Sequence, residues 1–274
     1  MGLDCILGYL ENKTILITGA TGFLAMVFVE KILRVQPNVK KLYLLIRASD
    51  AKLATQRMHD EIIGKELFRV LREKWGADFD SFISEKVVAL PGDVTFENLG
   101  VKEPSLIEEL CNEIQIILNS AATTNFDERY DISLAVNTFG VLQVLGLAKK
   151  CLKLEMLLHV STAYVCGERA GLLLEDSYSM DQMDFGIERA RLYGWPNTYV
   201  FTKAMGEIFL QRSKGNLPVV IVRPTIVTST HKEPFPGWIQ GFRTIDSVIA
   251  GYCKGKLSCL LVDPMTILDM YNGK

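Results

Sequence analysis

Six short apolar runs, separated by helix-length segments, constrain the fold more than any other feature of this 274-residue chain. In each run most positions on both alternating faces are apolar, which is typical of parallel strands buried on both sides. The runs are Thr14–Thr18, Lys41–Arg47, Lys86–Leu90, Ile114–Asn119, Met156–Ser161 and Leu217–Arg223. Helices are expected at Phe23–Val35, Leu53–Lys74, Pro104–Asn112, Leu134–Cys151 and Tyr199–Arg212. The alternation predicts an α/β fold built on a doubly wound parallel sheet.

Composition and charge narrow the class of protein. Hydrophobic residues make up 49% of the chain and charged residues 23%, with a mean hydropathy of +0.18, so intrinsic disorder is excluded. Thirty Lys and Arg residues against 32 Asp and Glu residues give a net charge of −2. A chain with this balance has no net positive charge to attract the phosphate backbone of a nucleic acid, so no nucleic-acid partner is expected. The three histidines are scattered and the six cysteines lack zinc-site spacing, so no metal is expected.

The first apolar run leads directly into a glycine-rich turn and then into a segment of helical period. Gly19 and Gly22 stand where a tight bend and a close approach of backbone to a pyrophosphate need glycine, and Ala25 takes the helix-packing position. The N–H groups that begin the helix suit the pyrophosphate charge. The expected cofactor-binding residues here are Gly19, Thr21, Gly22, Phe23 and Leu24. A tight turn without a ligand is the alternative for the glycine pair alone.

The second apolar run ends in Arg47, which bears on the choice of nucleotide. NAD sites usually present an acid to the ribose hydroxyls at this point, whereas NADP sites present Arg to the 2′-phosphate. The nearest acid, Asp50, lies three residues further on. The sequence therefore predicts NADPH, the alternative being that Arg47 is a solvated charge at the end of a strand.

Tyr199 and Lys203 are four residues apart, and this spacing puts a phenol and an ammonium on one face of a helix. A nearby cation favours the phenolate and brings the phenol closer to working pH as a general acid or base. Thr162 follows the fifth run, where its hydroxyl could hold a carbonyl oxygen or cap a turn. Asn137 is expected to cap or brace the helix around it. The Tyr-Lys spacing by itself is also common by chance.

Taken together, these motifs resemble the extended short-chain dehydrogenase/reductases and, within them, the plant alcohol-forming fatty acyl-CoA reductases. The resemblance covers nearly the whole chain and includes the unusually specific string GWPNTYVFTKAMGE at Gly194–Glu207. The other matching segments are Thr18–Ala25, Val29–Ala48, Pro91–Thr95, Asn119–Glu128, Val136–Gly140, His159–Gly167 and Arg223–Val227. Met26 stands where family members usually carry Lys or Arg.

The resemblance implies a Rossmann domain and assigns roles to individual residues. Thr162, Tyr199 and Lys203 are implied to be catalytic, with Asn137 as a helper. The implied cofactor contacts are Arg47, Tyr199 and Lys203, Asp93 and Val94 at the adenine, Asn119, Ser120 and Ala121 beside the cofactor, and Pro224, Thr225 and Val227 in the last motif.

The implied reaction is the reduction of a long-chain acyl-CoA by NADPH, a step of fatty-alcohol and wax biosynthesis. Tyr199 is expected to protonate the thioester oxygen, the hemithioacetal to release CoA, and a second reduction to turn the aldehyde into a primary alcohol. Two alternatives remain at this stage. A sugar-nucleotide epimerase or dehydratase shares the loop and the Tyr-Lys pair, and a non-catalytic dinucleotide-binding protein shares the loop.

The Gly- and Pro-bearing stretch Arg223–Gly237 predicts a Rossmann domain over residues 1–233 and an incomplete substrate lobe over 234–274. The chain is expected to be a C-terminally truncated form of the family. Apolar residues between 235 and 262 would then lack cover, which predicts self-association or peripheral membrane contact.

The beginning of the chain has no basic region typical of a leader peptide, and the longest uncharged stretch, Ile132–Ala148, is shorter than a membrane span. We therefore expect no signal peptide, transit peptide or transmembrane segment. The expected location is the cytoplasm or the surface of the endoplasmic reticulum membrane.

Overall fold

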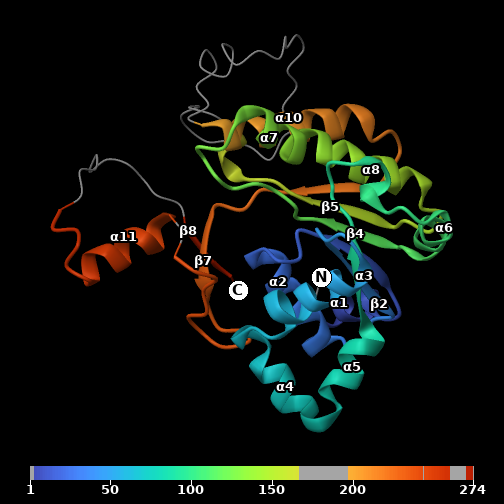
Figure 1. Ribbon diagram of the computed structural model, residues 1–274, viewed down its shortest axis with the longest axis horizontal. Helices are drawn as coiled ribbons and strands as arrows, with labels where there is room; N and C mark the ends of the chain where they lie inside the picture. The colour runs from blue at the N-terminus through green and yellow to red at the C-terminus, as the bar shows by residue number, and fades with distance from the viewer. Residues whose placement is uncertain (1–2, 167–196, 243, 260–269, 274) are drawn as a thin grey trace. The chain divides into compact units, whose positions relative to one another are not determined.

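The computed structural model describes residues 3–166, 197–242, 244–259 and 270–273, which fall into two compact units, Met1–Arg223 and Pro224–Lys274. The first unit contains a six-stranded sheet in the order β3-β2-β1-β4-β5-β6, with every neighbouring pair parallel (Figure 1). The strands are β1 Thr14–Thr18, β2 Lys41–Ile46, β3 Val87–Pro91, β4 Ile116–Asn119, β5 Met156–Val160 and β6 Val219–Val222. This order is the doubly wound topology, and it confirms the predicted fold class.

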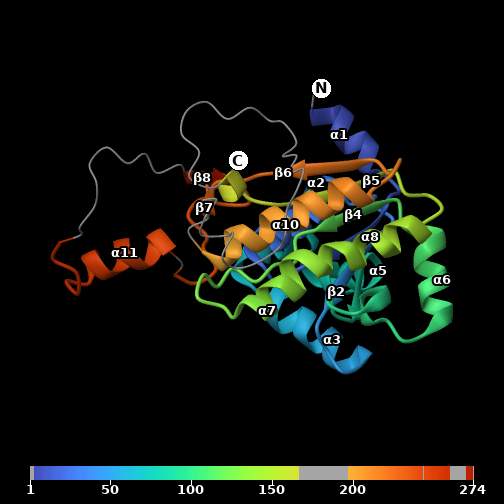
Figure 2. The ribbon, with the colours of Figure 1, turned by 90° about the horizontal axis from the view of Figure 1, so that it is seen from above.

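Helices cover both faces of the sheet, as the apolar runs require. Figures 1 and 2 show α7, α8 and α10 together over one face, with α2 on the other. The helices of this unit are α1 Leu3–Leu10, α2 Phe23–Val35, α3 Ala51–Met58, α4 Arg69–Trp75, α5 Phe79–Lys86, α6 Pro104–Glu113, α7 Tyr130–Leu134, α8 Gly140–Lys150 and α10 Thr198–Ser213. All five residues of β1 are buried, so the core lies on both sides of the central strands.

The single helix predicted over Leu53–Lys74 is wrong. Helix α3 ends at Met58, a π-helical turn covers His59–Ile63, and the chain turns at Gly64 before α4 begins. A Cβ at Gly64 would come within 2.7 Å of the carbonyl oxygen of His59, so the glycine allows the chain to close the turn tightly. The break produces several short helices in place of one long crossover helix.

The helical stretch Tyr130–Lys150 begins earlier than predicted and is not regular. A π-helical turn at Ala135–Phe139 separates α7 from α8. The stretch has 21 residues and a mean hydropathy of 1.4 in its most apolar window, so by length and composition it could cross a membrane. Half of that window is buried inside the protein. Packing on the sheet and on α10 accounts for its apolar character equally well.

Helix α10 approaches the π-helical turn closely because it carries a glycine there. The Cα of Gly206 lies so near the carbonyl oxygen of Asn137 that a Cβ would overlap that oxygen. One turn earlier, the Thr138 hydroxyl donates to the Thr202 carbonyl at 2.8 Å. The two elements therefore make contact through backbone and small polar groups.

The second unit is small and contains a two-stranded parallel sheet of β7 (Ile226–Thr230) and β8 (Met270–Gly273), together with α11 (Thr244–Cys253). Its Thr230 hydroxyl donates to the Phe235 carbonyl at 2.7 Å and accepts from the Trp238 N–H at 2.9 Å. The contacts of the first unit end at Arg223, before residue 233, and the predicted domain boundary there stays a prediction.

Several large apolar side chains around α11 are exposed. The exposed fractions are 59% for Phe242, 54% for Ile249 and 67% for Tyr252. Self-association or lipid contact through residues 235–262 stays a prediction. Residues 243 and 260–262 of that stretch lie outside the described residues.

The close approach at Gly206 predicts that Gly206→Ala will destabilise the protein by about 1–3 kcal/mol, because the added methyl group meets a backbone atom that has no room to move. Gly146→Ala in α8 is a matched control, since a Cβ there meets nothing within 4 Å and alanine favours the helix by about 1 kcal/mol. Thermal unfolding of both variants tests this. A Gly206→Ala variant as stable as Gly146→Ala would show that the two elements do not pack as described.

Candidate active site

The carboxyl ends of six parallel strands meet at one edge of the sheet, and most of the predicted site residues follow these ends. In doubly wound folds the ligand lies outside this edge where the strand order reverses, here between β1 and β4. The turn Gly19–Gly22 follows β1, and Asn119 ends β4. The structure therefore brings the predicted phosphate loop and the predicted cofactor wall together.

The turn after β1 comes so close to the loop after β4 that it has no room for a side chain at Gly19. Gly19 has φ +68, and a Cβ there would lie 2.7 Å from the backbone of Ser120 and Ala121. Gly22 is the N-cap of α2 and provides no side-chain cap, so N–H groups of the first turn, such as those of Leu24 and Ala25, are left for another acceptor. This cradle of backbone donors suits a diphosphate, and the residues present fit a dinucleotide. Met26, by contrast, is fully buried in α2.

A row of buried polar side chains crosses β1, β4 and β5 beneath this cradle. The Thr18 hydroxyl donates to Asn119 Oδ1 at 2.7 Å and accepts from the Ala121 N–H at 3.2 Å. The Asn119 amide nitrogen lies 3.1 Å from Nδ1 of His159. Asn119 is 2% exposed, so it supports the cradle from below, whereas Ser120 and Ala121 are half-buried. The row fixes where the two loops meet.

Arg47 is exposed at the end of β2, whereas the nearest acid, Asp50, is used as a helix cap. Arg47 is exposed immediately after β2, and its carbonyl accepts a hydrogen bond from Arg57. Asp50 is the N-cap of α3 and accepts from the Leu53 N–H at 2.9 Å, which lowers the pKa of the Asp50 carboxyl. Arg57 is paired with Glu61 at 2.6 Å. Arg47 is thus an exposed cation at this strand end, and its contact with a ligand phosphate stays a prediction.

The predicted adenine residues follow β3. Asp93 Oδ1 accepts from the N–H and the hydroxyl of Thr95, both at 2.9 Å, so the carboxylate fixes its own turn. Val94 is 7% exposed, and a Cβ on Gly140 would lie 3.1 Å from its Cγ2. The adenine contact of both residues stays a prediction.

Tyr199 lies in the first turn of α10, which Asn197 caps by accepting from the Val200 N–H at 3.0 Å. The ring lies 5.7 Å from the ring of Phe126. Burial raises the pKa of the Tyr199 phenol to about 12. Burial is the one cause of this shift and the lowering effect expected from Lys203 is not among its causes, so the phenol is protonated throughout the neutral range.

Lys203 is almost fully buried, with 1% of its surface exposed. Its Nζ donates to the Val160 carbonyl at the end of β5, at 2.6 Å. Burial lowers the pKa of the Lys203 ammonium to about 8, and Glu207 opposes this by raising it. Lys203 in turn adds to the effect of burial on His159, whose pKa lies well below its usual range, so that imidazole is neutral.

Thr162 and Asn137 differ in what their side chains are free to do. The Thr162 hydroxyl accepts a long contact of 3.4 Å from the Tyr164 N–H, which leaves its proton available. The Asn137 amide is fully engaged: Oδ1 accepts from the Thr123 N–H at 3.0 Å, and Nδ2 donates to the Thr123 carbonyl at 3.2 Å and to the Thr202 hydroxyl at 3.0 Å. Asn137 therefore braces the loop against α10, and its catalytic role stays a prediction.

Sequence reasoning missed one ion pair beside this site. Glu207 lies one helical turn after Lys203 and is buried. The Arg223 guanidinium, just after β6, binds it with Nη2 at 2.6 Å and Nε at 3.0 Å. The four-residue spacing of Lys203 and Glu207 indicates that these two are neighbours on the helix, but no local signal indicates the pairing of Glu207 with Arg223.

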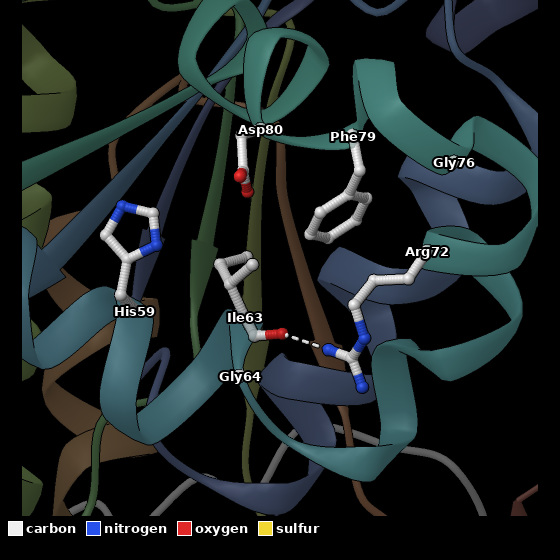
Figure 3. A pocket seen from close by; sticks show the side chains of 7 residues that line it. All are labelled: His59, Ile63, Gly64, Arg72, Gly76, Phe79 and Asp80. Atoms are coloured by element: carbon white, nitrogen blue, oxygen red, sulfur yellow. Dashed lines mark hydrogen bonds between the residues drawn. The ribbon is translucent and has the colours of Figure 1, made fainter.

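The predicted contacts of Pro224, Thr225 and Val227 belong to the second unit, and they stay predictions. A pocket of about 380 Å³ lies elsewhere in the first unit, among the short helices that follow β2 (Figure 3). Arg72 lines it and donates to the carbonyls of Ile63 at 2.8 Å and Lys65 at 3.2 Å. Its guanidinium closes the end of a helix, and none of the predicted site residues lines this pocket.

The chain is similar in sequence and in fold to known proteins. The chain is 52% identical to an alcohol-forming fatty acyl-CoA reductase of Simmondsia chinensis and to fatty acyl-CoA reductase 1 of Arabidopsis thaliana, in each case over 98% of this chain and 62% of the relative. The chain thus spans less than two thirds of the length of these relatives. Among solved structures, the terminal R domain of the myxalamid biosynthetic pathway is similar, with a TM-score of 0.60, 25% identity, and coverage of 80% of this chain and 50% of that one.

A family profile described as male sterility protein matches residues 17–272, from the first strand through the second unit. That range contains the glycine cradle, the strand-end Arg47 and the Tyr199-Lys203 pair. The chain therefore belongs to the male sterility protein family of NAD-binding domains, with plant fatty acyl-CoA reductases among its relatives.

Proposed function

We propose that this chain reduces a long-chain fatty acyl-CoA to a primary fatty alcohol with NADPH, the aldehyde staying bound between two reductions. One observation carries the proposal above all. Tyr199 and Lys203 lie at the sheet edge that holds the glycine cradle, in a chain 52% identical to relatives described as fatty acyl-CoA reductases. The relatives favour an acyl-CoA over a sugar nucleotide as substrate.

The cofactor is held by groups of this chain at both ends. The backbone around Gly19 and Gly22 binds the diphosphate, and Arg47 binds the 2′-phosphate of NADPH. Bound NADPH supplies a hydride to a carbonyl carbon. The exposed position of Arg47, together with the use of Asp50 as a helix cap, supports NADPH over NADH.

The side chains of α10 and of the turn after β5 act on the carbonyl oxygen. Tyr199 donates its phenolic proton to this oxygen, since its raised pKa keeps it protonated at neutral pH. The Thr162 hydroxyl orients the same oxygen. The Lys203 ammonium stabilises the phenolate that Tyr199 becomes, and Asn137 braces α10 from the π-helical turn.

The tetrahedral product of the first reduction is a hemithioacetal. Its collapse returns the hydroxyl proton to the Tyr199 phenolate and breaks the carbon–sulfur bond, so that the CoA thiolate leaves and an aldehyde remains. The second reduction consumes a second NADPH, uses the reprotonated Tyr199 phenol as the proton donor and gives the alcohol. Contact with the surface of the endoplasmic reticulum membrane would suit a substrate of low solubility, and the exposed side chains of Phe242 and Tyr252 support that location.

We predict that Arg47→Ala removes most of the preference for NADPH over NADH, because a charge-assisted contact to phosphate is lost. The affinity for NADPH should fall about 10-fold to 100-fold and that for NADH should stay unchanged. Arg69→Ala is the matched control, since Arg69, the first residue of α4, is also exposed but pairs with Glu66. Fluorescence titrations give both dissociation constants. Equal affinities for the two cofactors in the parent would contradict the assignment.

We also predict that Tyr199→Phe lowers the rate of acyl-CoA reduction by about 100-fold or more, since general acid catalysis contributes on that scale. NADPH affinity should stay within about 2-fold because the phenol acts on the substrate. Tyr130→Phe is the control: Tyr130 is another partly buried phenol, with its hydroxyl 3.9 Å from the sulfur of Met205. NADPH consumption and chromatography of the alcohol measure turnover. Equal rates for the Tyr199→Phe variant and the parent would rule out this role.

A further inference from the structure

Helix α10 carries three ionisable side chains at successive four-residue intervals, Tyr199, Lys203 and Glu207. Such a spacing lines them up along one face of the helix. Lys203 and Glu207 are 1% and 2% exposed, so both are removed from water. Charges in such a place interact far more strongly than on the surface.

Lys203 alone is poorly stabilised as a cation. Among the described residues, its ammonium donates to the carbonyl of Val160 at 2.6 Å. Burial lowers the pKa of this ammonium to about 8. At that value a modest further drop would leave the side chain neutral at physiological pH.

Glu207 is the anion that opposes this loss of charge, and its position is fixed. Arg223 holds the carboxylate with Nη2 to Oε2 at 2.6 Å and with Nε to Oε1 at 3.0 Å and to Oε2 at 3.1 Å. This pairing of a guanidinium with both oxygens restricts the carboxylate to one orientation. The Glu207 charge raises the pKa of Lys203, while Arg223 prevents it from being a lone buried anion.

We propose that Glu207, oriented by Arg223, is a positioning residue that keeps the buried Lys203 ammonium charged at neutral pH. The charge on Lys203 is a property of the fold. Its consequence for the reduction rests on the proposed function, in which Lys203 stabilises the phenolate of Tyr199.

Among the described residues, four groups decide the direction of the pH effect. Tyr199 and Glu207 each lie one helical turn from Lys203 on α10, His159 on β5 interacts with the Lys203 charge, and Arg223 at the end of β6 binds Glu207. Tyr199, with a pKa of about 12, stays protonated in the neutral range, and His159 stays neutral. Lys203 therefore loses its proton as the pH rises through about 8, and loss of the Glu207 charge moves that midpoint to lower pH.

The test is an NMR titration of the full chain labelled with ¹³C at lysine Cε, whose chemical shift reports the charge of each ammonium. Lys203→Met assigns the signal. We expect the parent midpoint near pH 8 and the Glu207→Gln midpoint lower by about 1 pH unit or more, since an opposite charge is removed and the Arg223 charge is no longer offset by the Glu207 carboxylate. An unchanged midpoint in a folded Glu207→Gln variant would overturn the proposal.

Two further variants keep the test decisive. Glu155→Gln removes a carboxylate that pairs with Lys13 at 2.6 Å on the surface, and the Lys203 midpoint should not move. The double variant Glu207→Gln/Arg223→Met removes both buried charges and is better tolerated than a half-broken pair. Its midpoint should lie below that of the parent and above that of Glu207→Gln. If Glu207→Gln does not fold, a double-variant midpoint at or above the parent's overturns the proposal.

Turnover separates this inference from the proposed function. In the parent, acyl-CoA reduction should decline above about pH 8, and in Glu207→Gln the decline should begin at lower pH, in step with the NMR midpoint. A shifted NMR midpoint in a chain that does not reduce acyl-CoA would refute the proposed function and leave the role of Glu207 intact. An unshifted NMR midpoint in a Glu207→Gln variant, in a chain that does reduce acyl-CoA, would refute the role of Glu207 and leave the proposed function intact.

Discussion

The parallel pairing of β1 with both β2 and β4 is the constraint on which the rest of the site depends. Because both neighbours run in the same direction as β1, every loop that follows them emerges at the same edge. The strand order reverses around β1, and glycine at position 19 lets the turn after β1 approach the loop after β4 so closely that a Cβ there would lie 2.7 Å from the Ala121 backbone. This parallel pairing puts the glycine cradle after β1 and Arg47 after β2 at one edge of the sheet. The Val160 carbonyl that binds Lys203, at the end of β5, lies at the same edge.

A second constraint is the burial of α10. The helix is buried at ten of its positions and has little amphipathic character, so nearly all of its circumference faces protein. Burial on all sides costs nothing for Val200 or Phe201 but removes water from Lys203 and Glu207. The ion pair with Arg223, the bond to the Val160 carbonyl and the close contact at Gly206 are the means by which the fold accommodates these groups.

The sequence predicted the strands well because each run is apolar on both faces, and it predicted α2 to the residue because Gly22 marks its start. It failed where tertiary contacts decide local structure. The π-helical turn around Asn137 depends on hydrogen bonds to Thr123 and Thr202, the latter 65 positions away, and no local pattern reveals them. The break at Gly64 was readable as a glycine inside a charged helical pattern, but its effect on the helix was not.

The same holds for the site. Individual residues and their spacing were predictable, since Tyr199, Lys203 and the glycines carry local signals. Their electrostatics were not, because these depend on what surrounds them. The expectation of a phenol made more acidic by Lys203 gave way to a phenol whose pKa burial raises to about 12. Asn119 is buried and links Thr18 to His159, which its local sequence does not reveal, and its predicted cofactor contact stays a prediction.

The pKa values of Tyr199 and Lys203 together indicate where the Lys203 charge acts in the proposed reaction. A phenol with a pKa of about 12 is present as the acid at neutral pH, but it is a weak acid and gives up its proton with difficulty. The cost of forming a phenolate in a site with little water must then be offset as the proton leaves. Lys203, one turn along α10 and charged below about pH 8, is placed to do this. Its charge would therefore contribute more to the transition state than to the resting protein, and the carboxylate of Glu207, held by Arg223, is what maintains it.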